Sequence, residues 1–190
     1  MEIRDCIYQR SNFLEEAHFK SFYNYIKDLS SYQEAQIVGS LGESGGVDTK
    51  IRSTKICGLA RENPSLTNNH WYNFLRSKIF QEVENYSKKI RLAELRGDMD
   101  INILKYITGD FYVYHIDDGH KTPRTISIII LINDDYEGGE LCFLSPDQKQ
   151  EITVKTEKNK IIMWPSNFLY PHAVKKVTKG VRYSIVSWIR

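Results

Sequence analysis

One pair of side chains in this sequence has the spacing of a metal-binding pair. His115 and Asp117 are separated by one residue at the end of a segment that reads as an extended strand. Side chains two apart in a strand point to the same face, so an imidazole and a carboxylate converge there. Five His and eleven Asp in 190 residues would give such a pair by chance about 0.3 times, so the pair alone is a weak motif. Two ligands hold a divalent metal loosely, and a third must come from elsewhere.

His172 is the candidate for this third ligand. It is the only histidine after His120, and it lies 57 residues past His115. Two histidines and one carboxylate that leave metal positions open form the facial triad of non-heme Fe(II) oxygenases. Ten residues later, Arg182 and Ser184 share one face of a predicted strand, where a guanidinium beside a hydroxyl suits a bound carboxylate.

Other candidate residues fit ordinary roles better. His120 is predicted to be a solvent-exposed loop residue rather than a ligand. Cys142 lies in a strand pattern with no Cys or His close by, so a buried thiol is favoured over a metal ligand. For Arg52, a surface ion pair is favoured over a contact with substrate. Trp188 is equally compatible with lining a pocket and with packing in the core.

The composition limits the class of protein. The chain is 41% hydrophobic and 26% charged, which is typical of one soluble globular domain over residues 1–190. A net charge of +2 with scattered Lys and Arg disfavours nucleic acid as a partner. No apolar run is long enough to predict a signal peptide or a membrane span. With three cysteines and no paired spacing, we expect the cytoplasm, or the host cytoplasm if the source is viral.

Two helices are expected before the strands that position these side chains. Asn12 is predicted to cap a helix that begins near Phe13. Its core-facing stripe is predicted to consist of Phe13, Ala17, Phe19, Phe22, Tyr23 and Ile26. A second helix is predicted after Pro64, with an apolar stripe of Leu75, Ile79, Val83 and Tyr86 that Trp71 and Phe74 extend. Residues 32–38 and 50–59 read as extended. Between them, Gly39–Asp48 is rich in glycine and predicts a mobile loop, either a lid over substrate or a plain connection.

The chain is β-rich from residue 101 onward. Thr125–Ile132 is the β-branched run of a strand buried on both faces. Asn159 is expected to adopt positive φ in a later turn. The other predicted strands cover 101–103, 106–113, 141–144, 151–156, 161–164, 174–177 and 182–189. About eight short strands behind two helices predict a mainly β (α+β) jelly roll, or double-stranded β-helix, in which two sheets enclose a pocket.

Several short motifs follow one another in a defined order. They are Tyr106-x-x-Gly109-x-x-Tyr112-x-x-His115-x-Asp117, Arg124-x-x-Ser127 with Asn133, Gly138-Gly139-Glu140-Leu141, Met163-Trp164-Pro165-Ser166, and His172 followed by Gly180-x-Arg182-x-Ser184 and Trp188. In this order they resemble the motifs of 2-oxoglutarate- and Fe(II)-dependent oxygenases of the prolyl 4-hydroxylase-like family. The resemblance covers nearly the whole chain and is most specific from Leu104 onward.

This resemblance implies a site and a reaction. The implied metal ligands are His115, Asp117 and His172. Arg182 would pair with the distal carboxylate of 2-oxoglutarate with help from Ser184, and Tyr106 would hydrogen-bond the same cosubstrate. The implied cofactors are Fe(II), 2-oxoglutarate and O₂, with ascorbate as an additional one. The implied reaction hydroxylates a C–H bond of a prolyl residue in a peptide or protein, or of a free amino acid or small molecule, and releases succinate and CO₂.

Leu131 departs from the family pattern. Many members carry a tyrosine there that reaches the distal carboxylate, so we expect the carboxylate to rely on Arg182, Ser184 and a hydroxyl such as that of Thr125. Trp164 replaces a phenylalanine, which is conservative packing.

Three other functions were compared with hydroxylation. A halogenase needs an open metal position where Asp117 stands, so hydroxylation is favoured. A non-catalytic jelly roll that binds a metal or a partner chain would lack a member of the triad, and none is missing. Nucleic-acid demethylation with the same iron chemistry predicts a basic groove, and the charge count argues against it.

Overall fold

The computed structural model describes residues 2–37, 46–60, 65–90, 95, 97, 99–120 and 122–190. Most of the predicted loop Gly39–Asp48, and Pro64, lie outside these residues. The elements are η1 (Ile3–Cys6), β1 (Tyr8–Arg10), α1 (Glu16–Asp28), β2 (Gln33–Glu34), β3 (Arg52–Ser53), β4 (Lys55–Leu59), α2 (Leu66–Ile90), β5 (Met99–Ile107), β6 (Phe111–His115), β7 (Ile126–Leu131), β8 (Glu137–Gly138), β9 (Leu141–Leu144), β10 (Glu151–Thr153), β11 (Lys160–Pro165), β12 (His172–Val174), β13 (Val177–Lys179) and β14 (Val181–Ile189). None of the described helices is long and apolar enough to cross a lipid bilayer.

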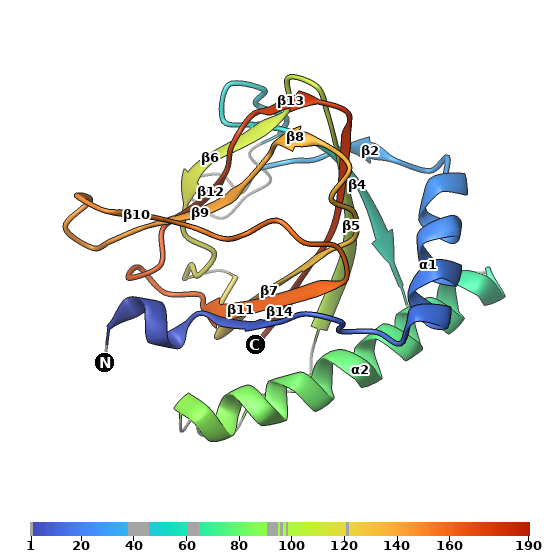
Figure 1. Ribbon diagram of the computed structural model, residues 1–190, viewed down its shortest axis with the longest axis horizontal. Coiled ribbons are helices and arrows are strands. Elements are labelled where there is room, and N and C mark those ends of the chain that lie inside the picture. Colours follow the sequence, from blue (N-terminus) through green and yellow to red (C-terminus); the bar gives the residue numbers. More distant parts are fainter. Residues whose placement is uncertain are drawn as a thin grey trace.

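Two antiparallel sheets face each other and confirm the predicted jelly roll. The larger sheet has the order β1-β11-β7-β14-β5-β4-β2, and the smaller has the order β10-β9-β12-β6-β3. A short ribbon of β13 and β8 closes one end. Figure 1 shows α1 and α2 on the outer side of the larger sheet, away from β6, β9 and β12. The space between the two sheets is therefore separate from the core under the helices.

Strand β7 of the larger sheet directs side chains both into the core under the helices and into the space between the sheets. All six of its residues are buried, as the β-branched run predicted. Ile128 and Ile130 pack with the helices, whereas Ile129 and Leu131 pack with the smaller sheet. This alternation is the period of two that a strand imposes. Ser127 has the same parity as Ile129, so it faces the space between the sheets.

The first helix begins later than predicted. Asn12 has φ of 53°, and α1 starts at Glu16 with Glu15 at its N-cap, so the predicted Asn12 cap is wrong. The reason is tertiary, because the backbone N–H of Phe13 and of Leu14 donates to the carbonyl and side-chain oxygens of Asn159, each at 2.9 Å. Asn159 itself has φ of 57°, which confirms its predicted turn conformation.

The apolar stripes of both helices are confirmed in large part. Helix α1 buries Phe19, Phe22 and Ile26, and α2 buries the predicted positions Trp71, Leu75, Ile79, Val83 and Tyr86. The exceptions are Ala17, which is exposed, and Tyr23 and Phe74, which are only partly buried.

Several predicted strands are shorter or divided. Among the described residues 32–37 only Gln33–Glu34 forms a strand, and the predicted strand 151–156 ends at Thr153 in β10. Segment 106–113 is divided between β5 and β6, and segment 174–177 is divided between β12 and β13. The second division follows from a change of partner, because β12 pairs with β6 and β9 whereas β13 pairs with β8.

Candidate active site

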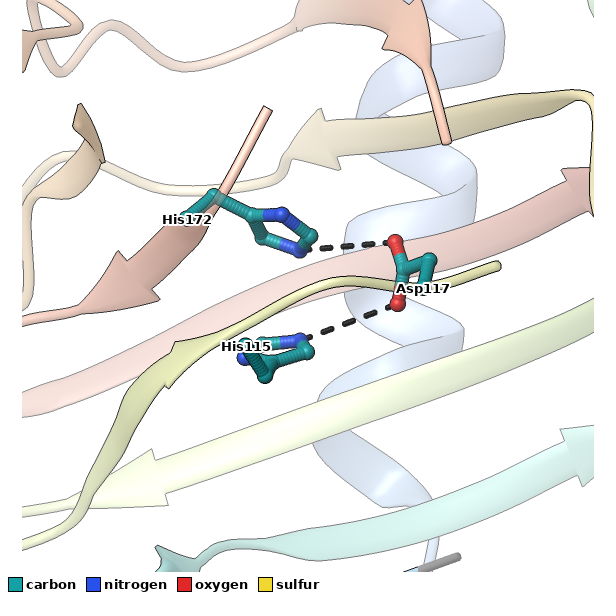
Figure 2. Close-up of side chains that lie close together, drawn as sticks. All are labelled: His115, Asp117 and His172. Carbon is teal, nitrogen blue, oxygen red and sulfur yellow. Dashed lines mark ion pairs between the residues drawn. The ribbon is translucent and has the colours of Figure 1, made fainter. Parts of the chain in front are cut away.

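Three side chains from distant parts of the chain converge between the sheets. His172 on β12 pairs directly with His115 at the end of β6, and Asp117 follows two residues later. The His172 Nε2 lies 3.4 Å from Asp117 Oδ2, and the His115 Nε2 lies 3.7 Å from Asp117 Oδ1 (Figure 2). One candidate ligand atom from each residue lies within 4.8 Å of the other two. A single divalent ion can contact three groups arranged in this way.

Both imidazoles are oriented by backbone carbonyl groups. The Nδ1 of His115 lies 2.9 Å from the carbonyl oxygen of Val113, and the Nδ1 of His172 lies 3.1 Å from that of Tyr170. A carbonyl only accepts hydrogen bonds, so each Nδ1 must carry the proton. In the neutral form of such a ring the lone pair is on Nε2, the atom that faces Asp117. Such outer contacts fix the tautomer and rotation of metal-binding histidines.

The protonation states also suit a cation. Burial and the neighbouring His172 lower the pKa of His115 to about 3, so its ring is neutral near pH 7. Burial by itself would raise the pKa of Asp117, but His172, His115 and the hydrogen bond from Ser127 together lower it below its usual value. A neutral imidazole and an ionised carboxylate, the forms indicated for His115 and Asp117, are those that bind a divalent transition metal.

Asp117 is held by polar groups whose role the sequence did not reveal. Ser127 donates its hydroxyl to Asp117 Oδ2 at 2.6 Å and lies 2.7 Å from the hydroxyl of Ser166. Arg124 donates to the Asp117 carbonyl at 3.3 Å and stacks over the ring of Trp188 at 3.6 Å. The available signal was Ser127 itself, a polar residue inside a run of isoleucines.

The triad opens into a cavity of about 730 Å³ between the sheets. Its lining includes Tyr106, Arg124 and Trp188, so Trp188 lines the pocket, one of the two roles the sequence allowed. Arg52 also lines the cavity, where its guanidinium lies 4.8 Å from the ring centre of Tyr112. Its Nε is buried without a partner, and it forms no ion pair with the described residues, so its place in the cavity wall agrees with the contact to substrate, the role that the sequence favoured less.

A second cationic group lies deeper than this lining. Arg182 is fully buried, donates from Nη1 to Ser184 Oγ at 2.7 Å and lies 5.1 Å from the ring centre of Tyr106. Its Nε and Nη2 are buried and have no hydrogen-bond partner. A buried guanidinium without a counter-ion is costly, so these free donors fit the carboxylate of a ligand.

One of the predicted roles is not supported, and two other predictions are confirmed. Thr125 is exposed, and its backbone bonds to Ile189 at the opposite end of β14 from Arg182, so its hydroxyl cannot serve a carboxylate at Arg182. Cys142 is buried as predicted, and its Sγ lies 3.6 Å from the hydroxyl of Thr153. His120 is exposed, also as predicted.

Parts of this sequence, and its fold, are similar to those of known proteins. Residues 101–190 match a family model described as the 2OG-Fe(II) oxygenase superfamily. A PKHD-type hydroxylase of Maricaulis maris is 25% identical over 154 residues, which cover 79% of this chain and 68% of the relative. Another, from Idiomarina loihiensis, is 32% identical over 94 residues, which cover 47% of this chain and only 41% of the relative.

A solved structure shares the fold over nearly the whole chain. It is a prolyl hydroxylase of Trichoplax adhaerens, solved in complex with a peptide fragment of the hypoxia inducible factor oxygen degradation domain. The TM-score is 0.79 at 15% identity, with 97% of this chain and 83% of the other covered. At this identity the likeness concerns the arrangement of helices and sheets.

Proposed function

Since the chain belongs to the 2OG-Fe(II) oxygenase superfamily and has a prolyl 4-hydroxylase-like fold, we propose that it hydroxylates a C–H bond of a prolyl residue in a peptide or protein. The single observation that carries the proposal is the convergence of His115, Asp117 and His172, each imidazole with its Nε2 free. In this proposal the three side chains bind Fe(II).

The buried end of the site would hold the cosubstrate. Arg182 and Ser184 would bind the distal carboxylate of 2-oxoglutarate, because two buried donors of Arg182 have no partner in the part of the chain that the structure describes. Tyr106 lines the cavity in front of Arg182 and would hydrogen-bond the same molecule. With O₂ and 2-oxoglutarate bound, Fe(II) supplies the chemistry that inserts one oxygen atom into a C–H bond and the other into succinate, with loss of CO₂.

The protein's own contribution is orientation. Val113 and Tyr170 hold the two imidazoles through their carbonyl groups, and Ser127 holds the carboxylate, so the donor set needs little rearrangement to receive a metal. The cavity walls that continue beyond the triad would position the substrate carbon. A peptide substrate is supported by the wide cavity and by the peptide-bound prolyl hydroxylase of the same fold.

One observation favours a second candidate substrate with the same chemistry. Arg52 lines the cavity, and its buried Nε has no partner, so a free amino acid or small molecule with a carboxylate would find a cation there. A non-catalytic metal-binding jelly roll is the remaining alternative, and turnover distinguishes it from both.

The test is turnover with Fe(II), 2-oxoglutarate and ascorbate in air. Proline-containing peptides and free amino acids are offered in separate pools, and mass spectrometry detects the addition of one oxygen atom while succinate is measured. We expect products in the peptide pool with the wild type and none with Asp117→Ala. Products in the amino-acid pool alone would favour the second candidate. If neither pool reacts and 2-oxoglutarate does not bind anaerobically, the proposed function is wrong.

A further inference from the structure

Tyr136 has a buried hydroxyl that forms no hydrogen bond with the described residues. The residue directly precedes β8, and part of its side chain is exposed. Its hydroxyl oxygen is nevertheless buried and has no hydrogen-bond partner. The polar end of the ring therefore points into the protein. A buried hydroxyl without a partner loses its hydrogen bonds to water without replacement, so such a group calls for an explanation.

The ring of Tyr136 reaches the same small space as Arg182. Gly139, which has φ of 67°, lies between them. A Cβ at Gly139 would come within 3.0 Å of Arg182 Cδ and within 3.2 Å of Tyr136 Cε2. The side chains of Arg182 and Tyr136 thus both pack closely against Gly139, where a larger residue would clash with them. Gly180 packs against the other end of Tyr136, because a Cβ at Gly180 would lie 3.3 Å from both the Cα and the Cβ of Tyr136.

The two side chains that flank Gly139 therefore both carry buried donors without partners among the described residues. Arg182 brings Nε and Nη2, both buried without partners, and Tyr136 brings its hydroxyl. Ser184 accepts a hydrogen bond from Arg182 and keeps its own hydroxyl proton. Leu131, which pairs with Ser184 across β7 and β14, is apolar and donates nothing. A carboxylate has about four lone-pair sites and accepts several such donors at once.

We propose that Tyr136 is a cosubstrate-binding residue, and that its hydroxyl donates to the distal carboxylate of 2-oxoglutarate beside Arg182 and Ser184. Tyr136, which directly precedes β8, thus provides the phenolic donor that Leu131 of β7 lacks. This inference rests on the proposed function, because it assumes that a 2-oxo dicarboxylate occupies the site. It predicts that Tyr136 discriminates between 2-oxo acids with and without the second carboxylate.

The test compares two ligands on two variants. Tyr136→Phe removes only the hydroxyl, and Tyr32→Phe is the matched control, because Tyr32 donates to the Ile26 carbonyl outside the cavity. Calorimetry under anaerobic conditions, with Fe(II) bound, measures the Kd of 2-oxoglutarate and of 2-oxopentanoate, which has the same chain length and no distal carboxylate. We expect Tyr136→Phe to weaken 2-oxoglutarate binding about tenfold or more, as for a hydrogen bond to a charged group, and to leave 2-oxopentanoate unchanged.

Thermal unfolding without ligand provides the second measurement. The Tyr136 hydroxyl has no partner among the residues that the structure describes, so Tyr136→Phe should unfold at the wild-type temperature or above. Equal affinity of wild type and Tyr136→Phe for 2-oxoglutarate would overturn the inference. Equal weakening of both 2-oxo acids would also overturn it, because the hydroxyl would then act only on the fold. If the wild type itself binds no 2-oxoglutarate, the failure lies with the proposed function.

Discussion

Replacing Ser127 by alanine should weaken metal binding although Ser127 is not itself a ligand. Its hydroxyl donates to Asp117 Oδ2 at 2.6 Å from a fully buried position. A hydrogen bond to a charged group contributes about 1.5–3 kcal/mol, and every 1.4 kcal/mol is about a tenfold change in affinity. Loss of an outer contact to a metal ligand costs about 10- to 100-fold in metal affinity. We therefore expect Ser127→Ala to raise the Kd for Fe(II) by about 10- to 100-fold.

The assay is an anaerobic titration of Fe(II) against a coloured competing chelator. Ser187→Ala is the matched control, because Ser187 is also a fully buried serine on the larger sheet but its hydroxyl has no partner. It pairs with Ile128 of the helix-facing layer, so its loss should leave the Kd unchanged. The reasoning is refuted if Ser127→Ala binds Fe(II) as tightly as the wild type, or if Ser187→Ala weakens it equally.

Three further predictions follow from the site. Arg182→Met should weaken 2-oxoglutarate binding at least about tenfold in calorimetry and leave the Kd for Fe(II) unchanged. The same substitution should not lower the unfolding temperature of the ligand-free protein, because it replaces a buried guanidinium that has no counter-ion among the described residues with an apolar side chain. Fe(II) at 100 times its Kd should stabilise the fold by about 2.7 kcal/mol, seen as a higher Tm that a chelator reverses and that His172→Ala abolishes. The pKa of His115 is about 3 in the folded protein and 6.5 in the unfolded chain, so between these pH values the unfolded state binds more protons. The metal-free protein should therefore lose stability as the pH falls from 6.5 towards 3. In thermal unfolding, His115→Asn should lose less stability over this pH range.

Much of the fold could be predicted from local pattern. The stripes of α1 and α2 and the six buried residues of β7 follow from hydrophobic period, which is a property of short segments. The start of α1 could not be predicted in this way. Asn12 is a good capping residue by type, but hydrogen bonds from Phe13 and Leu14 to Asn159 hold the backbone in another conformation. That interaction joins positions 145 residues apart.

The sequence by itself determined which chemistry the site could support. His115 and Asp117 share a face because a strand alternates, and the order of motifs pointed to His172 and Arg182. Only the tertiary structure decided how these groups are held and which others join them. Ser127 reaches Asp117, Arg52 lines the cavity, and Tyr136 and Arg182 both pack against Gly139. Thr125, in contrast, bonds to the end of β14 that is far from Arg182. The reason is that contacts between strands depend on sheet register and on where each strand ends, and neither is encoded in the spacing of any single segment.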